Sequence, residues 1–285
     1  TDTGTLYAGS RADAVRHTVT AIEHGFDYAV VGAPVIVADG LAGGYWGEIP
    51  VEGKRFQSVK IAGNILAADS MIVLSHVKGH DTAGFGGAIK NLAMGCAPPR
   101  GKAEQHAARP CLESGNCIGC GMCTMVCPQA AMTVVDGRAK FNPEHCVGCG
   151  DCVRSCPEGA IDFDWTTEIR PFIERLCEYA LGAVRGKPRR VGYINFLLNI
   201  TPDCDCVPWS DAAIVPDIGI LASTDPVAID HASFDLVNSE RGFARTHLAA
   251  NFAPGEDKFK GVWDYTDGEY QIDYAASIGL GEADY

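Results

Sequence analysis

The chain has 285 residues, 47% of them apolar, and its formal net charge is −13. This composition is that of a globular protein with enough apolar residues for one large domain or two smaller ones. The negative charge argues against nucleic acid, whose phosphates would repel it, and favours protein partners with basic surfaces. No apolar run approaches the ~20 residues that a membrane-spanning helix needs.

Short runs rich in Val and Ile alternate with helical patterns along most of the chain. The expected strands are residues 28–31, 71–74, 191–198 and 218–221, and the expected helices are residues 11–23, 59–67, 167–184 and 226–237. Asp225 is the expected N-cap of the last helix, with Pro226 in its first position. Continuous apolar strands favour a mostly parallel sheet with helices on both faces, so the predicted fold class is α/β.

Residues 111–165 interrupt this alternation with Cys, Gly and Pro. The predicted organisation is an α/β domain in two parts, residues 1–110 and 166–285, with residues 111–165 as a small α+β insert. The chain opens on Thr1 rather than Met, and its first residues are typical of the end of a strand. The first part is therefore expected to be truncated at its N-terminus.

Eight of the thirteen cysteines lie in the insert, in two copies of the spacing C-x-x-C-x-x-C-x-x-x-C-P. The first copy holds Cys117, Cys120, Cys123 and Cys127, and the second holds Cys146, Cys149, Cys152 and Cys156. Each copy leads into a short β-prone stretch, residues 132–135 and 161–163. A zinc site is the alternative, but zinc usually takes well-separated C-x-x-C pairs rather than overlapping, duplicated steps.

The duplicated spacing is typical of two 4Fe-4S clusters, in which the fourth cysteine of each run binds the other cluster. By this rule the first cluster takes Cys117, Cys120, Cys123 and Cys156. The second takes Cys146, Cys149, Cys152 and Cys127. Two neighbouring clusters imply an electron relay. Thiolate ligands must stay reduced, which predicts a cytoplasmic location.

The insert resembles the bacterial two-cluster ferredoxins. The rest of the chain resembles the domain of unknown function 362 family, which joins an α/β domain to such an insert in many anaerobes. Residues 76–80, 84–91 and 225–230 carry this resemblance. It implies an iron–sulfur protein of undefined reaction and leaves the substrate open.

Polar side chains follow the predicted strands, where open α/β sheets bind ligands. His76, His80 and Lys90 follow the strand at 71–74, and Asp230 follows the strand at 218–221, so all four are candidate catalytic residues. Gly84 to Gly87, ahead of Lys90, predict either an anion site at a helix N-terminus or a tight turn.

Five further cysteines lie outside the two runs. Cys204 and Cys206, one residue apart, are candidates for an additional metal site with Cys96 as a third thiolate, or for a redox-active pair. Two loop cysteines with a packing role are the alternative. Cys111 and Cys177 are expected to be structural, Cys177 as a small core residue.

These patterns favour an iron–sulfur redox protein that passes electrons to a partner protein or to a site in the α/β domain. The partner is expected to be a redox protein, such as a larger oxidoreductase complex. Two alternatives remain. One is a reductase of unknown substrate with its site at the strand ends. The other is a metal-handling or maturation protein that uses Cys204 and Cys206.

Overall fold

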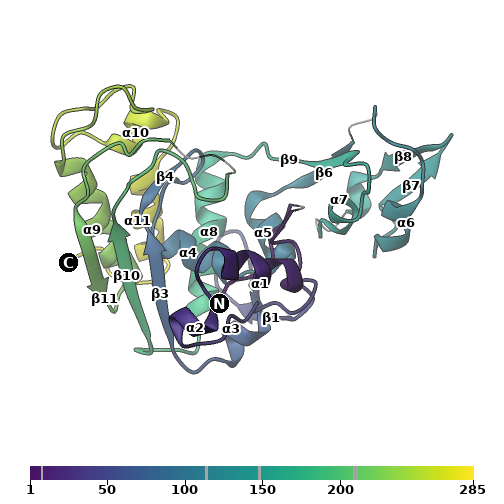
Figure 1. The fold of residues 1–285 in the computed structure, drawn as a ribbon, viewed down its shortest axis with the longest axis horizontal. Helices are drawn as coiled ribbons and strands as arrows, with labels where there is room; N and C mark the ends of the chain where they lie inside the picture. Colours follow the sequence, from purple (N-terminus) through teal and green to yellow (C-terminus); the bar gives the residue numbers. More distant parts are fainter. Residues whose placement is uncertain (8, 113–114, 147–148, 208, 210) are drawn as a thin grey trace. The chain divides into compact units, whose positions relative to one another are not determined.

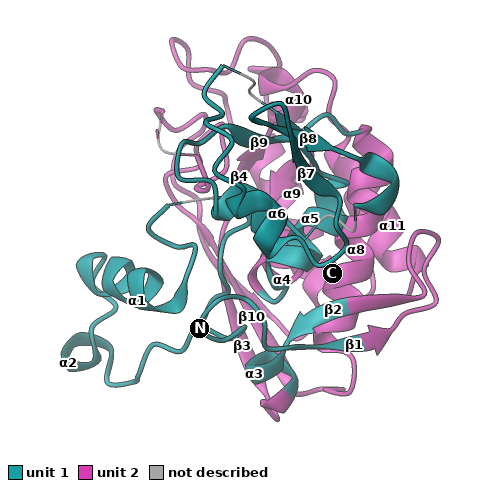
Figure 2. Ribbon diagram, turned by 90° about the vertical axis from the view of Figure 1, so that its right-hand side faces the viewer, with its two compact units in different colours: residues 1–48, 60–66, 96–167 teal, residues 49–59, 67–95, 168–285 magenta. Residues whose placement is uncertain are grey.

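The computed structural model describes all residues except 8, 113–114, 147–148, 208 and 210 (Figure 1). The chain folds into two compact units, each assembled from separate segments (Figure 2). The first unit consists of residues 1–48, 60–66 and 96–167, and the second of residues 49–59, 67–95 and 168–285. The predicted insert, residues 111–165, falls within the first unit together with the N-terminal segment.

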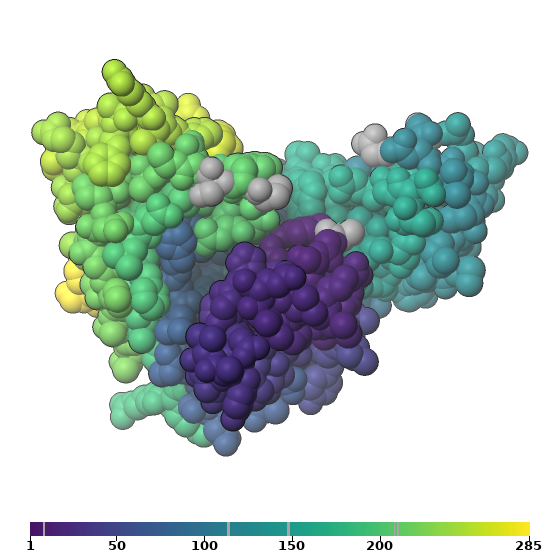
Figure 3. All heavy atoms as spheres, in the orientation of Figure 1, coloured from purple at the N-terminus to yellow at the C-terminus, as the bar shows by residue number. Residues whose placement is uncertain are grey.

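The N-terminal segment of the first unit is helical. Its helices α1 (Ala14–Glu23) and α2 (Tyr28–Val31) lie at the molecular surface, drawn in purple in Figure 3. The helix predicted at 11–23 is confirmed, but the strand predicted at 28–31 is wrong. Asp27 accepts a hydrogen bond from the amide of Ala29, and Gly32 ends the helix in a left-handed conformation at φ 70°. This cap and stop signal outweighs the β propensity of the short apolar run.

The helix predicted at 59–67 is only partly present. Residues Ser58–Ala62 form strand β2, which pairs with β1 (Trp46–Pro50), and α3 spans only Gly63–Ala67. Val59 and Ile61 are both fully buried. Because side chains two residues apart share one face of a strand, this burial pattern fits a strand.

The cysteine-rich part of the first unit consists of short elements in two antiparallel pairs, β6–β9 and β7–β8. In chain order they follow α5 (Pro99–His106) and are β6 (Arg109–Leu112), α6 (Met122–Val126), β7 (Met132–Val135), β8 (Arg138–Phe141), a 3-10 turn at Pro143–His145, α7 (Asp151–Arg154) and β9 (Ile161–Asp164). The strands expected at 132–135 and 161–163 are confirmed. Leu6, Met132, Ile161 and Phe163 are the large side chains of their common core.

The second unit is built on a three-stranded sheet in the order β11–β10–β3 (Figure 1). The strands are β3 (Met71–His76), β10 (Val191–Leu197) and β11 (Gly219–Ser223), close to three of the predicted strands. Strand β10 pairs with β3 in parallel and with β11 antiparallel. The prediction of a mostly parallel sheet is therefore wrong, because the sheets are small and most of their pairs are antiparallel, including β4 (Lys78–His80) with β5 (Gly84–Gly86).

Helices α4 (Ala88–Gly95) and α9 (Pro226–Ser239) pack on one face of this sheet. On that face, Ser75 of β3 accepts a hydrogen bond from Asn91 of α4, and its register partner Asn195 donates to Ser233 of α9. The opposite face carries Ile72, Leu74 and Ile220, which are exposed. Helices on both faces were expected, but these three strands present one face to helices and leave apolar side chains exposed on the other.

The remaining helices of the second unit complete its core. They are α8 (Ile169–Val184), α10 (Lys258–Val262) and α11 (Gly268–Ser277). The helices predicted at 167–184 and 226–237 are confirmed, and Asp225 accepts hydrogen bonds from the amides of Val227 and Ala228 as the expected N-cap. The core includes Phe85, Phe234 and Phe259, whose ring centroids lie 5.4 to 5.8 Å apart.

Candidate functional site

The two cysteine runs fold alike. Gly121 (φ 77°) precedes helix α6, which contains Cys123, and Gly150 (φ 74°) precedes helix α7, which contains Cys152. Both glycines adopt the left-handed conformation, which side chains disfavour. They let the backbone reverse between the second and third cysteine of each run, so that several thiols face one region.

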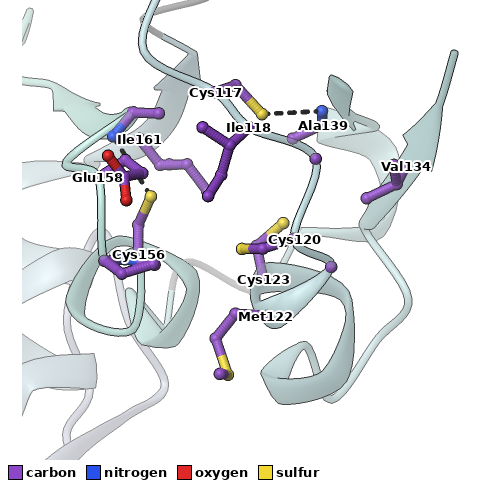
Figure 4. Close-up of a pocket in the computed structure, with 14 residues that line it drawn as sticks. Cys117, Ile118, Cys120, Met122, Cys123, Val134, Ala139, Cys156, Glu158 and Ile161 are labelled. Carbon is purple, nitrogen blue, oxygen red and sulfur yellow. Dashed lines mark hydrogen bonds between the residues drawn. The ribbon is translucent and has the colours of Figure 1, made fainter. Parts of the chain in front are cut away.

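Four thiols line the first cavity, whose space of about 340 Å³ is partly open to solvent (Figure 4). They belong to Cys117, Cys120, Cys123 and Cys156. In Figure 4, Cys120 and Cys123 lie side by side, and Cys156 extends from the opposite wall. Cys156 belongs to the second run, so this cavity holds three cysteines of one run and the last of the other.

A second cavity of about 310 Å³ shows the reciprocal arrangement. Its thiols belong to Cys127, Cys146, Cys149 and Cys152. Val147 and Gly148, which complete the spacing of the second run, lie outside the described residues. The two cavities thus group the eight cysteines into two sets of four, each with three cysteines of one run and the last cysteine of the other.

Backbone amides point at the sulfurs. The amide of Ala139 lies 3.3 Å from the Cys117 sulfur, the dashed line on the right of Figure 4. The amides of Ala131 and Ala160 donate to Cys127 and Cys156, each four residues earlier, at 3.1 and 3.3 Å. Such hydrogen bonds stabilise negative charge on sulfur.

Other thiols of these cavities are disfavoured as thiolates. Burial raises the pKa of Cys123 and Cys149, and it raises the pKa of Cys152 to about 12. A group that binds thiolates here must therefore supply positive charge of its own. Within the described residues, no three His, Cys, Asp or Glu side chains converge closely enough to hold a single metal ion. The four thiols of each cavity surround a volume rather than a point.

A second constellation lies in the second unit, at the end of β3. His76 Nδ1 is 2.9 Å from the Asp205 carboxylate, and Nε2 is 2.9 and 3.1 Å from the carbonyl oxygens of Leu198 and Asn199. Both ring nitrogens face acceptors, which favours the protonated ring, and the hydrogen bond to Asp205 raises the pKa of His76. Lys78 also lies 2.9 Å from Asp205. Burial alone would raise the pKa of Asp205, but these two cations lower it to about 2.

The structure brings Lys90, His80 and the Cys204–Cys206 pair together. The Lys90 ammonium donates to the Cys204 sulfur at 2.9 Å, across 114 residues of sequence. Cys204 is buried, whereas Cys206 is exposed. The pKa of Cys204 lies far below the usual thiol range, because the Cys206 thiol donates to its sulfur and Lys90 and His80 stabilise the charge. The same hydrogen bond raises the pKa of Cys206, and the pair shares one proton.

His80 is buried and stacks on Phe172, with ring centroids 6.1 Å apart. Its Nδ1 accepts hydrogen bonds from the amides of Thr82 and Ala83 at 3.0 and 3.1 Å. The Asp81 carboxylate lies 3.1 Å from the same nitrogen. Burial alone would lower the pKa of His80, but its hydrogen bonds with Asp81 and Cys204 raise it.

Asp230 of α9 connects this helix to the start of α4 and to strand β10 within the second unit. It is fully buried, and its carboxylate accepts hydrogen bonds from the amides of Ala88 and Ile89 at 2.7 and 2.8 Å and from the side chain of Asn195 at 2.8 Å. Burial raises its pKa to about 6. A side chain at Gly87 would meet the Asp230 carboxylate at 2.3 Å. The helix N-terminus proposed as an anion site is thus already occupied by a carboxylate of the protein.

A comparison with protein families matches residues 1–235 to a domain of unknown function, DUF362. The chain belongs to the DUF362 family. No curated protein matches the chain.

The three stretches that suggested this family all belong to the second unit of the DUF362 chain. Residues 76–80 run from the end of β3 into β4, residues 84–91 form β5 and the first turn of α4, and residues 225–230 open α9. Among the described helices of this DUF362 member, none is long and apolar enough to cross a membrane.

The five cysteines outside the two runs are divided between the two units. Cys96 is buried in the first unit, whereas Cys204 and Cys206 belong to the second. Cys111 lies half-buried in β6. Cys177 is fully buried in α8, and burial raises its pKa well above the usual range.

Sequence reasoning missed a buried acidic pair in this DUF362 chain. Glu174 and Glu178 of α8 are almost fully buried. Glu174 binds Lys54, Arg55 and the hydroxyl of Tyr270. Glu178 accepts a hydrogen bond from the amide of Arg55 at 2.9 Å. The signal was an acidic pair four residues apart in a predicted helix, a pattern that usually marks a solvated face.

Proposed function

We propose that this chain is an iron–sulfur redox protein that transfers electrons through two 4Fe-4S clusters. The observation that carries the proposal is the grouping of the eight run cysteines around two cavities, three from one run and the last from the other. This is the ligand pattern of bacterial two-cluster ferredoxins. The part of the first unit from 111 to 165 would then be a ferredoxin-like domain.

The residues present fit such a cluster better than a single ion. Four thiols spread around a volume suit a cube in which each cysteine binds a different iron, whereas a zinc ion needs its ligands at one point. The amides of Ala131, Ala139 and Ala160, aimed at sulfur, supply the hydrogen bonds that tune such centres. When bound, a 4Fe-4S cluster supplies one-electron redox chemistry. The chain's own residues fix the thiols and orient the amide donors.

The net charge of −13 favours a redox partner with a basic surface, which includes a larger oxidoreductase complex. Ligand thiols must stay reduced, so we place the protein in a reducing compartment such as the cytoplasm. A second candidate function is a reductase whose substrate binds in the second unit. It is favoured by the contact of Lys90 with Cys204, which no electron carrier requires.

Metal and sulfide analysis of the whole chain, purified without oxygen, tests the proposal. We expect about eight iron and eight sulfide ions per chain, four of each for every cluster. A Cys123→Ser variant should lose iron, and Cys111→Ser should keep it, since Cys111 lines neither cavity. Colourless protein, or protein that carries zinc and no iron, would reject the proposal.

A further inference from the structure

The loop that carries Cys204 and Cys206 is held firmly against β4. The amide of Gly79 in β4 donates to the carbonyl of Thr201 at 2.9 Å, and a side chain at Gly79 would meet the Pro202 carbonyl oxygen at 2.0 Å. The close approach requires glycine at position 79. It presses the loop onto the strand that carries Lys78 and His80, and this presents Cys204 to the interior and Cys206 to solvent.

The positive charge of Lys90 determines which kind of chemistry the Cys204–Cys206 pair favours. A half-buried ammonium group 2.9 Å from the Cys204 sulfur stabilises one negative charge on the pair. The Lys90 ammonium lies where a metal ion bound to the Cys204 sulfur would lie. Two cations would repel each other at that position. The geometry therefore favours a reactive dithiol over the metal site that the two cysteines alone suggested.

We propose that Cys204 and Cys206 form a reducing dithiol that acts on disulfide substrates, with exposed Cys206 as the attacking thiol and buried Cys204 as the resolving thiol. Lys90 holds the charge of the pair, and His80 positions the Cys204 sulfur. The substrate class is a disulfide, either a small one such as glutathione disulfide or one in an exposed peptide. This activity goes beyond electron transfer by the clusters and does not depend on them.

The chemistry balances without another reactant. The pair begins with one proton and one negative charge. Cys206 first transfers its proton to Cys204, and the Cys206 thiolate attacks the substrate, whose S–S bond breaks as a mixed disulfide forms and one substrate sulfur leaves as a thiolate. That leaving thiolate takes the proton from Cys204, and the Cys204 thiolate then attacks Cys206, which forms the Cys204–Cys206 disulfide and releases the second substrate sulfur as a thiolate. Two electrons pass from the dithiol to the substrate, and the products are one thiol, which carries the proton, and one thiolate.

The experiment uses the full, cluster-loaded chain under anaerobic conditions. Reduced protein is mixed with glutathione disulfide, or separately with a disulfide-bonded peptide, then quenched with an alkylating agent and mapped by peptide mass spectrometry. We expect a Cys204–Cys206 disulfide, recognised by the loss of two hydrogens. Product from one substrate alone identifies the small-molecule or the peptide source.

Three variants make the test decisive. Cys204→Ser should accumulate the mixed disulfide on Cys206, whereas Cys206→Ser should form no Cys204–Cys206 disulfide. Lys90→Met should slow the reaction about tenfold, the equivalent of about one pKa unit, and Lys90→Arg should restore most of it. Iron content, measured in parallel, should be unchanged in all of them, so a failure here is distinct from a failure of the cluster proposal.

Two results would overturn the proposal. One is that wild-type protein forms no Cys204–Cys206 disulfide with either substrate while its iron content is intact. The other is stoichiometric zinc binding that Cys204→Ser abolishes, because this would make the pair a metal site.

Discussion

The two cysteine regions of this chain differ in the groups that contact their sulfur atoms and in the direction in which the thiol pKa is shifted. In the cavities of the first unit, backbone amides such as those of Ala131 and Ala160 point at the thiols, and burial raises the pKa of Cys152 to about 12. In the second unit, the ammonium of Lys90 contacts the Cys204 sulfur directly, and the pKa of that thiol falls.

The two regions differ in the source of the positive charge that stabilises a thiolate. Thiolates need a nearby cation or strong donors to exist at neutral pH. The cavities leave room for a cationic group to supply that charge, whereas the Lys90 site already contains it. The number of cysteines does not distinguish a cavity lined by thiols from a thiol pair beside a lysine. The identity of the group that donates to the sulfur does.

The cavity side of this comparison is tested most strongly by Cys127→Ser. Cys127 ends the first run but lines the second cavity. We expect the variant to perturb the 4Fe-4S cluster proposed at Cys146, Cys149 and Cys152 far more than the other proposed cluster. EPR spectra of the reduced variant and the reduced wild type check this, and loss of only the first cluster's signal would show that the ligands are not crossed.

The structure of the second unit is tested next by Asp230→Ala. The variant leaves the buried amides of Ala88 and Ile89 and the side chain of Asn195 without their acceptor. We expect the free energy of unfolding to fall by about 3 kcal/mol, measured by urea denaturation. Asp235→Ala, on an exposed part of the same helix, is the control and should change it by less than about 0.5 kcal/mol. Equal effects would argue against a structural role for Asp230.

A smaller effect is expected in the pH dependence of stability. Burial raises the pKa of Asp230 to about 6 from its ordinary 3.8, so the folded protein binds this proton more tightly than the unfolded chain. Its contribution is therefore fully present below pH 3.8 and is lost as the pH rises through about 6. The unfolding free energy of the wild type, relative to Asp230→Asn, should decline across this window and then level off. A difference that rises with pH would contradict the assignment.

The smallest effect concerns His76. The Asp205 carboxylate raises the pKa of this imidazole, so Asp205→Asn should lower it toward the ordinary 6.5. NMR titration of the ring protons measures the change. Asp273→Asn, an exposed carboxylate on α11, is the matched control for loss of one charge. A His76 pKa that stays the same in Asp205→Asn would mean that the carbonyl oxygens of Leu198 and Asn199 alone hold the proton.

Several features could be predicted from local sequence because their causes are local. The N-cap Asp225 with Pro226 defines the start of α9, and the apolar runs at 71–74 and 191–198 locate β3 and β10. Asp27 and Gly32 are an equally local signal for helix α2, and the strand prediction, which rested on the apolar run between them, did not use it. The spacing of the eight run cysteines is also local, and it is the basis of the predicted cluster ligands.

Other features depended on which distant segments meet. Whether two strands are parallel or antiparallel depends on which strands pair. Strand β10 is parallel to β3 and antiparallel to β11, and the Val and Ile content of these strands does not distinguish the two cases. Lys90 and Cys204 are 114 residues apart, and their contact exists only because helix α4 and the loop after β10 come together. The sequence by itself determined the cysteine spacing and the helix caps, because both depend only on residues that are close together along the chain. The tertiary structure alone decided the sheet's pairing and the charge beside Cys204, because both arise from packing between remote segments.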